Sequence, residues 1–155
     1  MREILFRGKM LDTGTWVEGA FCLKDCDDPF GELQDRPSII KYAPPHDGYW
    51  FRVIPETVGQ LTGLFDKNGM KIFEGDVVRF TSSPGFYSYV GEVVFRKGAF
   101  CIKYKPSYSK TDHFHRIGET DRWQDMGASG DITHSYELMG NIHDNPELLA
   151  ADSTL

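Results

Sequence analysis

The chain has 155 residues, of which 40% are hydrophobic and 26% charged, a composition typical of a globular protein with one domain or two small ones. Its net charge of −6 argues against non-specific nucleic-acid binding, because a phosphate backbone attracts cations. There is no run of about 18 apolar residues, and charges interrupt the amino-terminal segment where a signal peptide would be apolar, so we expect a cytoplasmic protein with no membrane span.

Residues 1–57 are predicted to form an amino-terminal region of β-hairpins and loops. Its strand signals, which are short runs rich in aromatic and β-branched residues, occupy residues 3–9, 15–21, 38–42 and 49–54. The turn signal Asp12-Thr13-Gly14 joins the first two strands into a hairpin. The acidic segment 24–36 is expected to be an exposed loop, and Pro55 begins a junction because proline cannot donate in a central ladder.

The segment from Thr62 to Phe80 carries two turn signals between alternating strand signals. The first turn contains Asn68-Gly69, a pair that readily adopts positive φ and favours tight hairpins. The second contains Gly75-Asp76, where we expect the aspartate to bond to nearby backbone amides. These four residues are therefore predicted to have structural roles.

Residues 58–149 repeat this rhythm of strands and turns, which predicts a small β-barrel. The predicted strands lie at residues 58–64, 70–73, 76–81, 89–96, 99–104 and 135–142, with turns about every 8–12 residues. A polar segment at 105–134 shows neither the helical nor the strand period of apolar residues, and it is predicted to be a long irregular insertion. Asn145 and Pro146 suit the N-cap and first position of a short helical turn, and 150–155 is expected to be a tail.

The predicted core consists of apolar residues on the inward side of these strands. They are Phe6, Trp16, Val17, Leu64, Ile72, Val77, Phe80, Val93, Phe95, Phe100, Ile102 and Leu138.

Two histidines are the candidates for a metal site. His113 and His115 are two positions apart, which on a strand places both rings on the same face, and Asp112 or Asp121 would complete a site of two histidines and one carboxylate. No third ligand occurs at a sequence spacing characteristic of a metal site, so a solvated polar loop is the favoured interpretation of these residues. We therefore predict no metal and no cofactor.

The cysteines and the usual catalytic motifs indicate no reaction. Cys22, Cys26 and Cys101 form an odd set without a CxxC pair, which favours reduced thiols over disulfides. Cys26 lies among aspartates, whose negative charge disfavours a reactive thiolate. Nucleotide-binding, zinc-protease and serine-hydrolase motifs do not occur in the sequence. No catalytic residue is predicted, and an enzyme is the least favoured class.

A strip of alternating cations and aromatic residues at 95–110 is the candidate for nucleic-acid binding, because small barrels bind single strands with such surfaces. Its predicted contact residues are Arg96, Lys97, Lys103, Tyr104 and Lys105. The same alternation arises in a β-hairpin that turns its aromatic residues inward and its lysines outward. The overall acidity of the chain favours this second interpretation.

Four stretches of the sequence are distinctive together: REILFRGK at 2–9, WVEGAF at 16–21, ETVGQLTGLFDKNGMKIFEGDVV at 56–78 and YELMGNIHDNPELL at 136–149. Over these stretches the sequence resembles the YopX-like proteins, a family encoded by bacteriophages and prophages. The resemblance does not extend to residues 24–54 and 105–134, which agrees with variable loops there. The resemblance implies a β-rich fold with an SH3-like barrel in the second half, a tendency to self-associate and no assigned activity.

Together, these observations predict a mainly β protein with an amino-terminal hairpin layer, an SH3-like barrel and a short carboxy-terminal helical turn. The expected function is that of a non-enzymatic phage or prophage accessory protein in the host cytoplasm. It would act through protein contacts, as a homo-oligomer or with a phage or host protein. The alternative is a nucleic-acid-binding barrel that uses the strip at 95–110.

Overall fold

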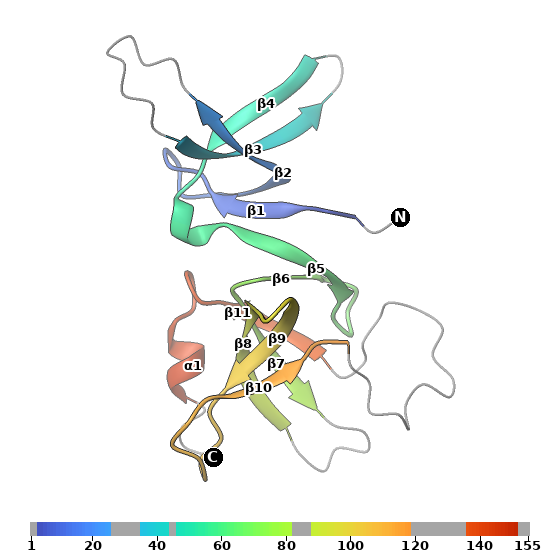
Figure 1. Cartoon of the computed structure of the whole chain (residues 1–155), viewed down its shortest axis with the longest axis vertical. Helices are drawn as coiled ribbons and strands as arrows, with labels where there is room; N and C mark the ends of the chain where they lie inside the picture. Colours follow the sequence, from blue (N-terminus) through green and yellow to red (C-terminus); the bar gives the residue numbers. More distant parts are fainter. Residues whose placement is uncertain (1–2, 26–34, 44–45, 82–87, 119–135, 152–155) are drawn as a thin grey trace. The chain divides into compact units, whose positions relative to one another are not determined.

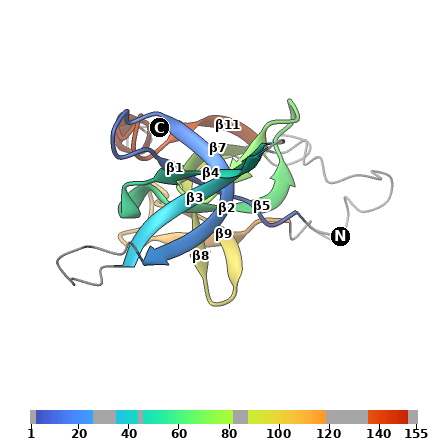
Figure 2. The same ribbon diagram turned by 90° about the horizontal axis from the view of Figure 1, so that it is seen from above.

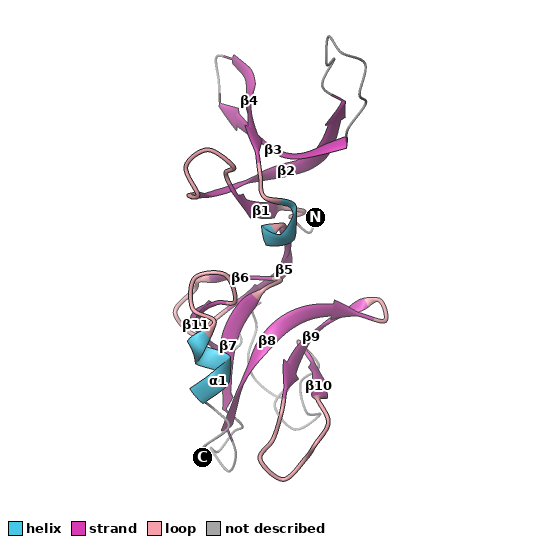
Figure 3. Cartoon of the chain, turned by 90° about the vertical axis from the view of Figure 1, so that its left-hand side faces the viewer, coloured by secondary structure: helices cyan, strands magenta, loops and turns pink. Residues whose placement is uncertain are grey.

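A computed structural model describes residues 3–25, 35–43, 46–81, 88–118 and 136–151. Over these residues the chain is mainly antiparallel strand, with one turn of 3₁₀ helix and one short α-helix (Figure 3). The mainly β fold predicted from the sequence is therefore confirmed. The chain divides into two compact units, Met1–Leu61 and Thr62–Leu155.

The amino-terminal unit is a twisted antiparallel sheet in which the long strands β2 and β3 curve together (Figures 1 and 2). Its strands are β1 (Phe6–Lys9), β2 (Trp16–Asp25), β3 (Asp35–Ala43), β4 (His46–Arg52) and the beginning of β5 (Gly59–Phe65). Among the described residues the order is β4-β3-β2-β1-β5, so consecutive strands are neighbours until β5 returns to pair with β1. The 3₁₀ helix η1 (Pro55–Thr57) makes this return possible.

The β1–β2 hairpin forms where the sequence predicts it. Gly14 has a φ of 68° and its N–H donates to the Met10 carbonyl at 2.8 Å, closing the turn. At this same end of β1, the Lys9 N–H donates to the Thr57 hydroxyl at 2.8 Å, and that hydroxyl donates to the Ile54 carbonyl at 2.7 Å. Thr57 therefore anchors the return connection to β1.

The core of this unit is small and is built on Val17, Ile39 and Val53. Phe6 and Phe21 pack against it, with ring centroids 5.4 Å apart. The predicted exposed loop at 24–36 is shorter than expected, because β2 continues to Asp25 and β3 begins at Asp35, in antiparallel register with each other. The rest of that loop lies outside the described residues.

The carboxy-terminal unit contains the end of β5 and a second antiparallel sheet. Its further elements are β6 (Lys71–Phe73), β7 (Asp76–Thr81), β8 (Ser88–Arg96), β9 (Ala99–Tyr104), β10 (His113–Arg116), β11 (Tyr136–Asn141) and α1 (Glu147–Ala151). β6 lies next to β5, and the second sheet has the order β10-β9-β8-β7-β11. Within the described part of the chain, no strand pair joins β10 to β11, so closure into a barrel is not found.

Strand β10 corrects the predicted irregular insertion at 105–134. His113–Arg116 pairs antiparallel with the end of β9, from His113 opposite Tyr104 to Arg116 opposite Cys101. The sequence did not reveal it because four residues, with polar side chains on both faces, leave too short a pattern to read. Residues 119–134 of the predicted insertion, including Asp121, are not among the described residues.

The core of the carboxy-terminal unit is a cluster of buried side chains on one face of its strands. The members are Ile72, Val78, Phe80, Val93, Ile102 and Tyr136. Of the predicted core, Phe95 is wrong, since it is 54% exposed. It lies at the end of β8, beyond the cluster and just before the hairpin turn, where its ring contacts Phe100 edge-on at 5.1 Å.

The first predicted turn of this unit is organised by a buried aspartate. The N–H groups of Asn68 and Met70 donate to Oδ1 of Asp66 at 2.8 and 2.9 Å, and Gly69 has a φ of 79°. The Leu138 N–H donates to Oδ2 at 3.1 Å, which ties the turn to β11. Burial acts to raise the pKa of Asp66, but its hydrogen bonds outweigh burial and hold the pKa below its ordinary value.

The second predicted turn lies between β6 and β7. Gly75 has a φ of 82°; its N–H donates to the Val93 carbonyl at 2.8 Å, and its own carbonyl accepts from Ile142 at 2.9 Å. The buried side chain of Asp76 accepts a hydrogen bond from the Phe73 N–H at 2.7 Å. Gly75 therefore connects this turn to β8 and to the residue that follows β11, and Asp76 closes the turn from β6.

The short helix α1 lies beside β8 (Figure 3). It begins at Glu147, directly after the predicted capping residues Asn145 and Pro146, and the Leu148 N–H donates to the Asn145 carbonyl at 3.1 Å. Among the described residues, no helix combines the length and apolar character needed to cross a bilayer.

Candidate functional site

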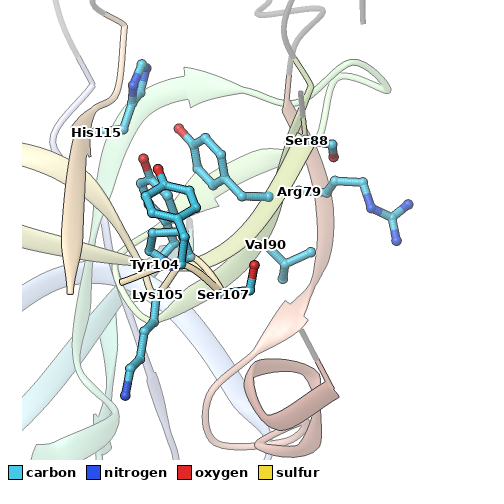
Figure 4. Close-up of a pocket in the computed structure, with 10 residues that line it drawn as sticks. Arg79, Ser88, Val90, Tyr104, Lys105, Ser107 and His115 are labelled. Carbon is cyan, nitrogen blue, oxygen red and sulfur yellow. The ribbon is translucent and has the colours of Figure 1, made fainter. Parts of the chain in front are cut away.

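The carboxy-terminal unit contains a cleft of about 580 Å³, a volume within the usual range for small-molecule sites. The start of β8, the end of β9 and the segment that follows β9 form its walls, and β10 contributes one histidine (Figure 4). Its aromatic lining consists of Tyr89, Tyr104, Tyr108 and His115. We refer to it below as the tyrosine cleft.

Strand register explains why these rings meet. Phe80 of β7 pairs with Tyr89 of β8, and Tyr104 of β9 pairs with His113 of β10. Because side chains alternate along a strand, His115 shares the face of His113. Strand pairing thus brings aromatic residues from β7, β8, β9 and β10 together on one side of the sheet.

The rings are in close contact. Tyr89 and Tyr104 are stacked, with centroids 3.8 Å apart and planes inclined by 12°. Phe80 lies 5.1 Å from Tyr89 and 5.0 Å from His115. Aromatic pairs in this range stabilise one another by about 0.5–1.5 kcal/mol beyond simple burial. The cleft therefore has a rigid aromatic wall.

The segment after β9 also lines the cleft and is held by local hydrogen bonds. The Ser109 N–H donates to the Pro106 carbonyl at 3.0 Å, and the ring Nε2 of His113 lies 3.1 Å from the Ser109 hydroxyl. Tyr108 packs edge-on against His113 with centroids 6.0 Å apart, yet it is 83% exposed. This tyrosine presents most of its ring to solvent.

The two histidines considered for a metal site contribute rings to the aromatic cluster. The described residues contain no group of three or more histidine, cysteine, aspartate or glutamate side chains that could hold a metal ion. Asp112 forms an ion pair with Lys103 at 3.6 Å. Asp121 lies outside the described part of the chain.

Two cations flank the cleft. Arg79 forms an ion pair with Glu137 at 3.2 Å, and Lys67 approaches the other oxygen of Glu137 at 3.1 Å. The hydrogen bond with Lys67, aided by the nearby charges, lowers the pKa of Glu137. Lys105 is exposed and forms no ion pair with any residue that the structure describes. Figure 4 shows Arg79 and Lys105 extending in different directions from Tyr104.

The residues predicted for nucleic-acid contact lie at three places. Arg96 lies over the ring of Phe114 at 3.9 Å, and Lys103 shares that outer face of the sheet because Phe114 pairs with it. Lys97 occupies the β8–β9 turn with a φ of 50°. Tyr104 and Lys105 line the tyrosine cleft.

The sequence did not single out Tyr89 or Ser88, which also line the cleft. Both lie in or beside a strand that the sequence predicted, and Tyr89 belongs to an ordinary apolar alternation. The available signal was the pairing of Phe80 with Tyr89 across a hairpin, and that pairing needs a strand register that the sequence does not specify. The sequence did single out His115 as a candidate metal ligand and Tyr104 as a candidate nucleic-acid contact, but it did not link the two.

Comparison with known proteins gives a family and similar solved structures. No curated protein matches the sequence. The crystal structure of protein EF1440 from Enterococcus faecalis is similar, with 21% sequence identity, a TM-score of 0.43, and coverage of 96% of this chain and 99% of that one. The model of the family described as YopX protein matches residues 12–150. This match confirms the resemblance drawn from the sequence, and the chain belongs to the YopX protein family.

Proposed function

We propose that this protein is a non-enzymatic accessory protein of a phage or prophage, that it acts in the cytoplasm of the host bacterium, and that it works by associating with other protein chains. The first partner is a second copy of the same chain. The observation that carries the proposal is the strand β4, which we call the edge strand because β3 is its sole neighbour among the described residues.

The edge strand exposes the residue types that protein interfaces use. Tyr49 and Trp50 are 50% and 49% exposed. Tyrosine and tryptophan are enriched in interfaces and dominate their binding energy. A strand edge also offers unpaired backbone donors and acceptors to any chain that pairs with it, and proteins use such edges for recognition.

A second copy fits this edge well. The run from Gly48 to Phe51 carries no charge, so two copies of a chain with a net charge of −6 can approach here with little repulsion. Antiparallel pairing of two edge strands about a two-fold axis would bring Tyr49 close to Tyr49 of the other copy on one face of the joined sheet, and Trp50 close to Trp50 of the other copy on the opposite face. Phage or host proteins that add a strand would use the same edge.

The proposal includes an SH3-like barrel for the carboxy-terminal unit. Supporting it, β7 to β10 form a meander of consecutive antiparallel neighbours, and β11 returns to the free side of β7. A last strand that returns beside the first is the arrangement expected of a small barrel. Such scaffolds present function through loops and surfaces rather than through the fold itself.

The test is the oligomeric state of the full chain and of two matched variants, measured by sedimentation velocity over a range of concentrations. Trp50→Lys places a charge on the edge strand, whereas Leu11→Lys places one on another exposed apolar residue, 62% exposed, outside the edge. We expect the wild type and Leu11→Lys to associate alike. Trp50→Lys should weaken association by about 2 kcal/mol or more, which is about 30-fold. A monomeric wild type, or equal association of both variants, would refute the proposal.

A further inference from the structure

We propose that the tyrosine cleft binds a nucleotide, with the base stacked on tyrosine and the phosphate close to Lys105. The nucleotide is either free or part of a single strand. This goes beyond the proposed association through the edge strand and does not depend on it, because the cleft lies wholly within the carboxy-terminal unit.

The aromatic lining is the first reason. Stacking on aromatic side chains is the main way in which proteins hold unpaired bases, and it tolerates any base because each has a π-face. The Tyr89–Tyr104 pair forms a firm wall, and Tyr108 exposes most of its ring at the cleft. A tyrosine that is 83% exposed costs little to cover, so a base that stacks on it gains apolar burial directly.

The second reason is that the exposed tyrosine is held in place before any ligand arrives. Ser109 closes the turn from Pro106, and its hydroxyl lies 3.1 Å from the ring nitrogen of His113. His113 in turn packs against both Tyr104 and Tyr108, with centroids 5.6 and 6.0 Å away. Preorganised aromatic surfaces bind more tightly because less conformational freedom is lost on binding.

The third reason is the position of the charges. Lys105 lines the cleft and has no carboxylate partner among the described residues, so its ammonium group is available to a phosphate. Arg79 lines the cleft too, and it extends in a different direction. Because Arg79 is paired with Glu137, Lys105 is the cation that the proposal assigns to the phosphate. Because the chain as a whole is acidic, stacking should contribute more to the free energy of binding than attraction between charges does.

Hydroxyl groups complete the lining. Ser88 and Ser107 line the cleft, and the Ser88 hydroxyl donates to the Phe80 carbonyl at 2.9 Å, which fixes its position. Its oxygen can still accept a hydrogen bond from a base or sugar. A cleft of aromatic walls with a few fixed polar groups and a cation has the chemistry that a nucleotide requires.

The test is fluorescence anisotropy of the full chain with a labelled oligo-dT of about 10 nucleotides, at low salt and over a salt series. Tyr108→Ala should weaken binding by about 5- to 150-fold, the range observed for loss of one base–aromatic stack. Lys105→Glu should weaken binding and lower the slope of log K against log salt by about one.

Two matched controls and a competitor decide between alternatives. Lys97→Glu makes the same charge change in the β8–β9 turn, and Phe95→Ala removes an exposed ring near the end of β8, away from the cleft at its start; both should bind like the wild type. Competition by a mononucleotide assigns the site to free nucleotides, whereas oligo-dT binding without such competition assigns it to a single strand. The proposal is overturned if neither ligand binds, or if Lys97→Glu weakens binding as much as Lys105→Glu. If Tyr108→Ala self-associates like the wild type, nucleotide binding in the tyrosine cleft is independent of association through the edge strand.

Discussion

The buried carboxylate of Asp66 is predicted to be a main determinant of the stability of the carboxy-terminal unit. Only 1% of this residue is exposed, and each carboxylate oxygen accepts two hydrogen bonds. Asp66→Asn keeps the shape of the side chain but replaces one acceptor oxygen with an NH₂ group. Whichever oxygen is replaced, two N–H donors then face a donor instead of an acceptor.

The magnitude follows from these bonds. A hydrogen bond to a charged group contributes about 1.5–3 kcal/mol, and a buried donor left unsatisfied costs about 1–3 kcal/mol. The side-chain amide of Asn68 can turn to water, whereas the backbone N–H of Leu138 is held by β11. We therefore expect Asp66→Asn to lower the free energy of unfolding by about 2–4 kcal/mol at pH 7.

The pH dependence gives a second check on Asp66. Its folded-state pKa lies below the ordinary value of 3.8, so the charge stabilises the fold above that pH and this contribution is lost as the pH falls through the folded-state pKa. The difference between wild type and Asp66→Asn should accordingly shrink in acid.

The assay is urea unfolding of both proteins and of Asp112→Asn at pH 7 and in acid. Asp112 is 46% exposed and belongs to a surface ion pair, so its substitution should cost less than about 1 kcal/mol. The reasoning about Asp66 is refuted if its variant is as stable at neutral pH as the Asp112 variant.

Two further predictions concern β8. Gly91→Ala should lower the melting temperature more than Gly14→Ala, because a Cβ at position 91 would lie 2.5 Å from the Lys103 carbonyl oxygen, whereas position 14 is open and carries only the strain of its φ of 68°. Equal melting temperatures would contradict this packing. Glu92→Gln should stabilise the protein above pH 4.5 and make little difference below it: burial, partly opposed by Lys103, raises the folded-state pKa of Glu92, so ionisation disfavours the fold as the pH rises through that pKa. Urea unfolding at pH 4 and pH 7 checks this, and a destabilised variant at pH 7 would contradict it.

Much of the strand layout is readable from the sequence because local chemistry specifies it. Gly69 and Gly75 take the positive φ that glycine favours, and the alternating runs beside them become β6 and β7. The limits of local information appear at β10 and Phe95. The first is recognisable only from its pairing with β9, and the second is apolar but lies beyond the reach of the core.

The candidate site was less predictable than the fold. The sequence linked Tyr104 with Lys103 because they are adjacent, but adjacent side chains on a strand point to opposite faces. Tyr104 instead meets Tyr89, fifteen positions earlier, through the register of β8 and β9. Register depends on the whole sheet, so the tyrosine cleft could be recognised only once the strands were paired.

The most direct test of the proposed association is hydrogen exchange of the backbone amides of β4 as the protein concentration is raised. β10 is a built-in control, since it too has a single strand neighbour among the described residues. We predict that amides of His46–Arg52 exchange more slowly at high concentration while those of His113–Arg116 keep the same rate. Exchange in β4 that does not change with concentration would contradict self-association through the edge strand.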